Sequence, residues 1–139
     1  MSPVAKPLPK VSPEMAPFFE AARRHELVVQ RCRGCRALRF PARDRCSRCL
    51  SREAEWIRVS GRGTVFSYAV MHQLYHPGFA AEVPYAVVVV ELEEGVRILS
   101  NLVDCPASEV TVGLPVEAVF EEVSPEITLP KFRPSRPAR

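Results

Sequence analysis

The segment CRGCRALRFPARDRCSRC, residues 32–49, contains two Cys-x-x-Cys pairs separated by ten residues. Two such pairs on a short loop can place four thiolates at the corners of a tetrahedron, which is the geometry of a structural Zn²⁺ site. The ten residues between the pairs include no Cys or His, so no other ligand set competes. Two disulfides or four free thiols are the alternatives, but this paired spacing is typical of metal sites. We therefore predict a zinc site formed by Cys32, Cys35, Cys46 and Cys49.

The residues on both sides of this segment predict a helix followed by a three-stranded ribbon. Ser12-Pro13-Glu14 is a helix start, with Ser as N-cap and Pro at the first helical position, and the helical spacing of apolar residues ends near His25. Strands are expected at residues 27–30, 38–40 and 53–59. Because so small a ribbon buries little apolar surface, we expect the metal–ligand bonds to supply most of its stability.

One local feature departs from the usual pattern of metal-binding loops. Such loops often carry Gly directly after the second Cys of a pair, where the backbone needs a positive φ. Arg36 and Leu50 occupy those two positions. We therefore expect slight backbone strain at both residues, with the ligand set intact.

A turn at Ser60-Gly61-Arg62-Gly63 separates the ribbon from a region rich in strands. The run PYAVVVVEL, residues 84–92, lacks apolar–polar alternation and is expected to be a strand buried on both faces. Four to five strands with a long first strand and a connection after the third are typical of a Greek-key barrel of the oligonucleotide/oligosaccharide-binding (OB) type, with a small sandwich as the alternative. The expected strands are residues 64–74, 84–92, 96–103 and 116–123, with a short final one at 126–129.

The predicted fold class is therefore mainly β, with an N-terminal helix and a rubredoxin-like zinc ribbon followed by a small OB-fold barrel. Both ends of the chain are basic and rich in proline, which is typical of flexible tails or linkers. The expected domain division is a tail at 1–12, the helix and ribbon at 13–59, the barrel at 60–129 and a second tail at 130–139.

Charge is distributed unevenly between the two halves. Residues 1–62 contain 14 Lys and Arg against 6 Asp and Glu, whereas residues 63–139 contain 5 against 10. A basic ribbon attracts phosphates, nucleic acid or an acidic protein face, and the alternative is a solvated surface around the metal.

The sequence also predicts the cellular compartment. The first apolar stretch is short and interrupted by prolines, which is unlike a secretory signal, and no window approaches the roughly 20 apolar residues of a membrane span. We therefore expect a cytoplasmic protein with reduced thiols. The fifth cysteine, Cys105, is interpreted as a small residue at a strand end rather than as a nucleophile.

No residue pattern predicts catalysis by this chain itself. A four-thiolate site leaves no open position for water or substrate. The turn at residues 60–63 resembles a phosphate loop, but no helix follows it. His72 and His76 are the best candidates for proton chemistry, although a structural hydrogen bond or a partner contact is the favoured interpretation. His25 is expected at a helix C-terminus, where a cation is favoured.

A longer series of motifs resembles one protein family. The cysteine pairs are followed by Trp56, SGRGTV at residues 60–65, His72, Pro77, Phe79, Pro84-Tyr85 and EGVR at residues 94–97. This order, over residues 13–123, resembles the zinc-ribbon plus OB-fold proteins of acyl-CoA metabolism, long catalogued as a domain of unknown function. The resemblance favours zinc over iron at the four cysteines.

The resemblance also implies a partner. Members of the family act beside a thiolase-like enzyme that holds the catalytic residues. The known settings are hydroxymethylglutaryl-CoA synthesis, acetyl transfer to phloroglucinols and retro-aldol cleavage of steroid side-chain CoA thioesters. We therefore expect a non-catalytic accessory subunit that stabilises such an enzyme in a hetero-oligomer acting on an acyl-CoA. The steroid side-chain aldolase is the leading setting, with a hydroxymethylglutaryl-CoA synthase or acetyltransferase complex as the alternative.

A nucleic-acid-binding module is the alternative from another class, because zinc ribbons and OB barrels bind nucleic acid in other proteins. Binding along an OB barrel needs basic residues and exposed aromatic side chains on the strand face. Residues 63–129 contain a single basic residue, Arg97, against ten Asp and Glu. This charge opposes a phosphate backbone, so nucleic acid is not the expected partner.

Overall fold

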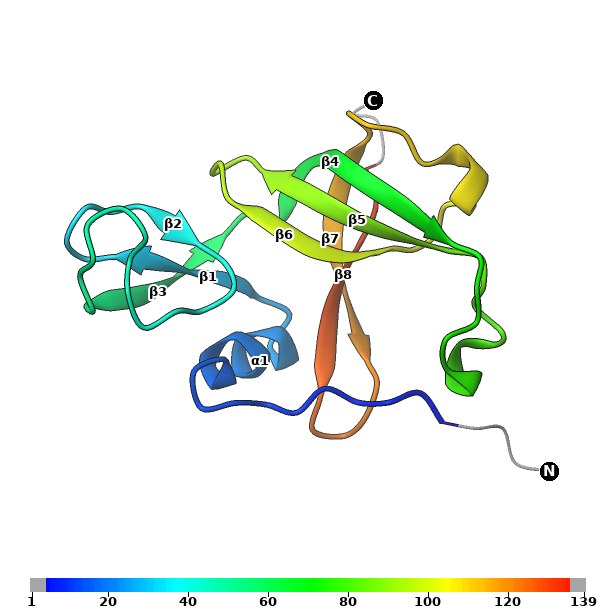
Figure 1. The fold of residues 1–139 in the computed structure, drawn as a ribbon, viewed down its shortest axis with the longest axis horizontal. Helices are drawn as coiled ribbons and strands as arrows, with labels where there is room; N and C mark the ends of the chain where they lie inside the picture. The colour runs from blue at the N-terminus through cyan, green and yellow to red at the C-terminus, as the bar shows by residue number, and fades with distance from the viewer. Residues whose placement is uncertain (1–4, 136–139) are drawn as a thin grey trace.

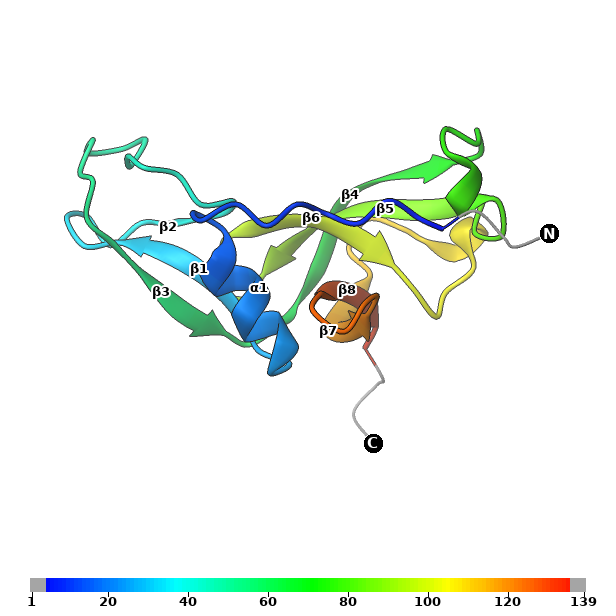
Figure 2. The same cartoon turned by 90° about the horizontal axis from the view of Figure 1, so that it is seen from below.

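The computed structural model describes residues 5–135, which form two β-units that share one core (Figures 1 and 2). The ribbon is a three-stranded antiparallel sheet of order β2-β1-β3, and the second unit is a closed barrel of order β4-β5-β6-β8-β7. The ribbon strands are β1 (Leu27–Cys32), β2 (Leu38–Arg39) and β3 (Ala54–Val59). The barrel strands are β4 (Arg62–Met71), β5 (Tyr85–Leu92), β6 (Arg97–Leu102), β7 (Pro115–Glu122) and β8 (Thr128–Pro134). The mainly β class, the ribbon and the five-stranded barrel are confirmed.

The helix α1 (Ala16–Arg23) begins later than the sequence pattern predicts. Ser12 instead closes a turn, in which the Met15 N–H lies 3.1 Å from the Ser12 carbonyl oxygen and 3.3 Å from its hydroxyl. A helix starting at Pro13 would need a hydrogen bond from the backbone nitrogen of Pro17, which carries no hydrogen. Pro17 therefore lies in the first turn of α1, where no such bond is required.

The C-terminus of α1 is closed by His25, as the sequence predicts. The N–H groups of His25 and Glu26 donate to the carbonyls of Ala22 and Ala21, each at 2.9 Å, and His25 adopts a φ of 60°. This is the usual arrangement of a helix that ends in a left-handed residue. The His25 ring stacks on Phe120 of β7, with centroids 5.1 Å apart, so the helix end is tied to the barrel.

The predicted N-terminal tail packs on the barrel over its described part. Residues 5–12 have no regular structure, but the Lys6 ammonium lies 3.1 Å from the Glu82 carboxylate. A Cβ added to Gly78 would lie 2.7 Å from the Ala5 carbonyl oxygen, so a glycine is needed where this segment passes. Residues 1–4 lie outside the described residues.

The predicted basic tail from residue 130 is wrong over its first half, because β8 extends from Thr128 to Pro134 and pairs with all of β7 but its first residue. Phe132 is fully buried within it. Proline normally argues against a strand, since it lacks an N–H. The Phe132 carbonyl accepts from Val103 N–H at 2.7 Å on the side away from β7. The backbone groups of Pro130 and Pro134 also face away from β7. Their missing N–H groups therefore remove no hydrogen bond between β7 and β8. Residues 136–139 lie outside the described residues.

The β5 strand is buried on one face only, which corrects the prediction of burial on both. Its inward residues Ala86, Val88, Val90 and Leu92 are at most 2% exposed. The outward residues Val87 and Val89 are only half-buried. The described chain therefore covers one face of a strand whose sequence is apolar on both.

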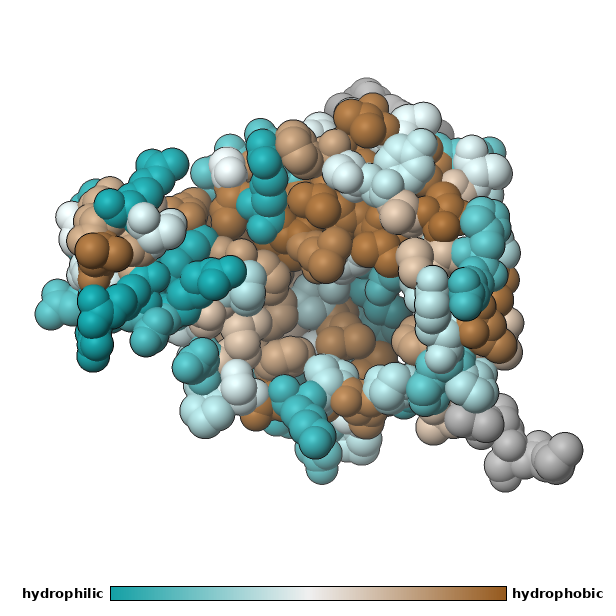
Figure 3. All heavy atoms as spheres, viewed as in Figure 1, coloured by the Kyte–Doolittle hydropathy of each residue, from teal (hydrophilic) through white to brown (hydrophobic). Residues whose placement is uncertain are grey.

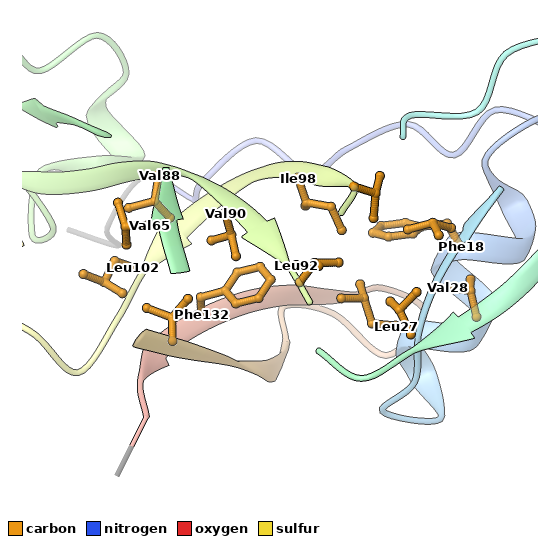
Figure 4. Close-up of a cluster of buried hydrophobic side chains, with 14 of the residues drawn as sticks. Phe18, Leu27, Val28, Val65, Val88, Val90, Leu92, Ile98, Leu102 and Phe132 are labelled. Atoms are coloured by element: carbon orange, nitrogen blue, oxygen red, sulfur yellow. The ribbon is translucent and has the colours of Figure 1, made fainter. Parts of the chain in front are cut away.

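One continuous core joins the ribbon to the barrel (Figure 4). Phe18 and Leu27 contribute from α1 and β1, and Phe132 contributes from β8, with Leu92 and Ile98 between these groups. Full burial of one such side chain stabilises the fold by about 1.5–3 kcal/mol. Packing in this shared core thus holds the ribbon against the barrel. In the described part of the chain, no helix is long and apolar enough to cross a membrane.

Candidate metal centre

The structure brings together the four cysteines that the sequence singles out. Cys32 ends β1, Cys35 follows in the first loop, and Cys46 and Cys49 lie in the second loop before β3. Their four sulfur atoms all lie within 4.8 Å of one another, and the Cys32–Cys49 and Cys35–Cys46 sulfurs are each 3.5 Å apart. Sulfurs bound to one tetrahedral zinc ion at about 2.3 Å would be ~3.8 Å apart. The cluster therefore has the size of a Zn–S₄ site, and its sulfurs are not joined as disulfides.

Backbone N–H groups point at two of the sulfurs. The Cys32 sulfur lies 3.3 Å from Gly34 N and 3.5 Å from Cys35 N, and the Cys46 sulfur lies 3.4 Å from Arg48 N. Such donors stabilise a thiolate. The Cys35 N–H lowers the pKa of Cys32, and the N–H groups of Cys49 and Arg48 lower the pKa of Cys46 to about 6. Both loops are therefore preorganised for negatively charged sulfur.

Four thiolates cannot share this space without a cation. The Ser51 N–H favours the Cys49 thiolate, but the neighbouring cysteines outweigh it and raise the pKa of Cys49 to about 11. Side-chain hydrogen bonding with Cys32 and burial are the main causes that raise this pKa, and a bound divalent cation would favour the thiolate instead. The donor set thus fits zinc. All four positions of a tetrahedral ion would be filled by protein, so the site is a structural one.

The backbone strain expected in the two loops is present. Arg36 and Leu50 both adopt a φ of 65°, directly after the second cysteine of each pair. The Arg36 and Leu50 N–H groups donate to the carbonyls of Cys32 and Cys46, each at 2.9 Å. The left-handed backbone therefore closes both loops, at a cost of roughly 1–2 kcal/mol for each non-glycine residue.

The other candidate residues lie apart from the cysteine cluster. His76 accepts a hydrogen bond from Gly78 N–H at 3.0 Å through Nδ1, so the structural interpretation of this histidine is confirmed. His72 is exposed. Cys105 is half-buried after β6, and burial together with the Glu109 carboxylate raises its pKa, which disfavours a nucleophilic thiolate. The structure brings none of these three residues into one site.

Arg39 is a residue that the sequence analysis did not single out. Its Nε donates to Gln30 at 2.8 Å and its Nη2 donates to the Arg43 carbonyl at 2.8 Å. Its Nη1 is buried and has no hydrogen-bond partner among the described residues. No sequence signal distinguishes Arg39 from the seven other arginines between residues 31 and 52, because the difference arises only from packing.

A closed four-cysteine ribbon fused to an OB-fold barrel defines the class of this protein. Two family profiles match, "ChsH2, rubredoxin-like zinc ribbon domain" at residues 19–55 and "ChsH2, C-terminal OB-fold domain" at residues 56–121. A "DUF35 domain-containing scaffold protein" of Methanocaldococcus jannaschii is 40% identical, over 72% of this chain and 71% of its own length. The chain therefore belongs to the DUF35 family of zinc-ribbon and OB-fold proteins.

Two other relatives are longer proteins, and one further similar chain has a solved structure. A "probable enoyl-CoA hydratase alpha subunit" of Thermomonospora curvata is 42% identical over 95% of this chain and 41% of its own length. A "3-oxo-4,17-pregnadiene-20-carboxyl-CoA hydratase alpha subunit" of Mycobacterium tuberculosis is 37% identical over 86% and 38%. The chain thus spans about two fifths of these two relatives. A chain of the solved "Ltp2-ChsH2(DUF35) aldolase" superposes with a TM-score of 0.82 and 42% identity, covering 91% of this chain and 98% of that one.

Proposed function

We propose that the four cysteines hold a structural zinc ion and that this chain is a non-catalytic accessory subunit of a thiolase-like acyl-CoA enzyme. The observation that carries the proposal is the likeness to a chain of the Ltp2-ChsH2(DUF35) aldolase over almost the whole of that chain. The proposed reaction of the complex is retro-aldol cleavage of a steroid side-chain CoA thioester. In this role the chain binds and stabilises the partner, which supplies the catalytic residues.

The chemistry of the described residues supports a non-catalytic role. The proposed zinc site has no free position for substrate or water. The more enclosed pockets hold about 60, 110 and 200 Å³, whereas small-molecule sites usually enclose roughly 300–1,000 Å³. The larger hollows, of about 360 and 460 Å³, are open to solvent. His76 is used in a backbone hydrogen bond. Substrate binding and acid–base chemistry are therefore assigned to the partner.

The names of the longer relatives support the substrate class. The Thermomonospora curvata and Mycobacterium tuberculosis proteins are named as alpha subunits of CoA-thioester hydratases, one of them for a pregnadiene carboxyl-CoA. Hydration of an unsaturated thioester yields the β-hydroxy thioester that a retro-aldol step cleaves. A steroid side-chain CoA thioester is therefore the substrate we propose for the complex.

A second setting is supported by one observation. The Methanocaldococcus jannaschii relative, which this chain matches over 71% of its length, is named a scaffold protein. A scaffold in a hydroxymethylglutaryl-CoA synthase or acetyltransferase complex is therefore the second candidate, and it requires the same kind of thiolase-like partner.

Co-expression tests the proposal. The thiolase-like subunit of the source organism would be produced with and without this chain, and its soluble yield and co-purification would be measured. We expect a stable complex and a large loss of soluble partner when this chain is omitted. A partner that is equally soluble alone and does not co-purify with this chain would refute the proposed function.

A further inference from the structure

An apolar surface covers the outer side of strands β4, β5 and β6 (Figure 3). Val89 on β5 lies directly opposite Leu99 on β6, which is 65% exposed. On its other side Val89 pairs with Ser67 of β4, next to the bulge where Phe66 is 45% exposed. We call the residues Phe66, Val87, Val89 and Leu99 the outer apolar face.

This face explains why the β5 sequence and the structure disagree. A continuous run of β-branched residues is typical of a strand that is covered on both sides. The described chain covers only the inward side, with Val88 and Val90 fully buried and Val87 and Val89 half-buried. Contiguous exposed apolar patches on soluble proteins usually mark interaction sites. The β5 sequence therefore fits a strand whose second face is covered by another molecule.

A groove that contains two arginines and one glutamate adjoins the outer apolar face. It lies between the ribbon and the β5–β6 hairpin and encloses about 360 Å³. The Arg97 guanidinium lies 3.6 Å from the centroid of the Phe66 ring and 3.2 Å from the Glu91 carboxylate, so this arginine connects the groove to the face. The lining residues are Leu38, Arg39, Phe40, Glu91, Gly95, Val96 and Arg97.

The arginines of the groove indicate the charge of an occupant. Arg97 is exposed where the groove meets the face, and a guanidinium pairs best with a carboxylate. Arg39 is held within the ribbon by its hydrogen bonds to Gln30 and Arg43. The half of the chain that includes the ribbon is strongly basic, with 14 Lys and Arg against 6 Asp and Glu in residues 1–62. Charge complementarity thus favours an occupant that is acidic beside its apolar centre.

We propose that the outer apolar face and the adjoining groove form the docking surface for the thiolase-like partner subunit. The partner covers Phe66, Val89 and Leu99 with apolar side chains and places a carboxylate in the groove near Arg97. This inference rests on the proposed function for the identity of the partner, but the surface itself is derived from the chain.

A pair of matched substitutions tests the surface. Leu99→Glu places a charge on the outer apolar face, and Val112→Glu places the same charge at a residue of equal exposure, 67%, between η2 (Ala107–Glu109) and β7. Each variant would be co-expressed with the Ltp2 subunit of the solved aldolase and with the thiolase-like subunit of the source organism. We expect the wild type and Val112→Glu to form the complex, and Leu99→Glu to bind at least about tenfold more weakly, a loss of ~1.4 kcal/mol. Equal binding by Leu99→Glu and the wild type would overturn the proposal.

An arginine variant tests the acidic component. Arg97→Gln should weaken the complex and reduce the dependence of its affinity on salt. Zinc content and thermal unfolding show whether the variant is folded, which is expected because the Arg97 side chain is 54% exposed. Unchanged affinity in folded Arg97→Gln would count against the groove.

The oligomeric state separates the remaining outcomes. If the isolated chain is a dimer that Leu99→Glu dissociates, a second copy occupies the face and the docking proposal is wrong. If the wild type binds neither thiolase-like subunit, the proposed function fails as well. Loss of binding in Leu99→Glu but not in Val112→Glu supports the docking surface. Equal loss of binding in both variants contradicts it.

Discussion

At the scale of single residues, the left-handed positions Arg36 and Leu50 show how the metal loops are closed. Each residue adopts a φ of 65° so that its N–H can return to the carbonyl of the first cysteine of its pair. Glycine would take this conformation without steric cost. The presence of larger side chains means that the loops retain strain, which the metal and the packed ribbon must offset.

Replacement of Leu50 by glycine should therefore stabilise the protein. Relief of the left-handed strain, less the greater freedom of glycine in the unfolded chain, leaves a gain of about 0.5–1 kcal/mol. The measurement is the thermal midpoint of the zinc-loaded protein, which should rise by roughly 2–4 °C. Val112→Gly is the matched control, because Val112 is 67% exposed against 65% for Leu50 and has no positive φ. A midpoint that falls equally in both variants would show that the strain argument is wrong.

At the scale of elements, the ribbon combines ligand bonds with a share of the core. Cys32 and Cys46 are almost completely buried, and β1 contributes Leu27 and Val29 to the apolar cluster. Apparent zinc-binding free energies of such ribbons are about 10–16 kcal/mol, which equals or exceeds the stability of a typical domain. Loss of zinc should therefore affect the barrel as well as the ribbon.

Cys46→Ser should abolish stoichiometric zinc binding and leave β1 and β3 without protection from hydrogen exchange. The measurements are metal content by mass spectrometry and exchange of the ribbon amides. Cys105→Ser serves as the control and should retain one zinc per chain. Retention of zinc and of amide protection in Cys46→Ser would contradict the ligand assignment.

The strand β8 is the element that the sequence analysis largely missed. Phe132, which is fully buried, lies between Pro130 and Pro134 in a stretch whose composition resembles a tail. Phe132→Ala should cost about 3–5 kcal/mol in the free energy of unfolding by urea. Phe66→Ala, at an exposed position of β4, should cost far less. Similar losses in the two variants would mean that β8 does not close the barrel.

These elements also show how far prediction from sequence extends. The cysteine spacing was sufficient to predict the ribbon, and the turn glycines and β-branched runs were sufficient to predict four barrel strands. The start of α1 and the extent of β8 depend on whether the nitrogen of each nearby proline lies where a backbone hydrogen bond is needed. Local sequence does not reveal this. The half-exposure of Val87 and Val89 and the unpaired Nη1 of Arg39 arise from tertiary packing. These features became visible only in the structure, and the half-exposure of the two valines supports the docking proposal.

At the scale of the whole molecule, a basic ribbon and an acidic barrel are locked together by one core, with an apolar face beside the groove between them. The described residues contain a four-cysteine cluster suited to a structural metal, and their enclosed pockets are small. These features are consistent with the accessory role that we propose from the likeness to a chain of the solved aldolase. We therefore propose that activity belongs to the complex.

The most direct test is a titration of activity. A fixed amount of the thiolase-like partner would be mixed with increasing amounts of this chain, and the rate of retro-aldol cleavage of a steroid side-chain CoA thioester would be measured. We expect negligible activity for either protein alone, a rate that rises and saturates as wild-type chain is added, and no rise with Leu99→Glu. Full activity of the partner alone, or cleavage by this chain without a partner, would contradict the account.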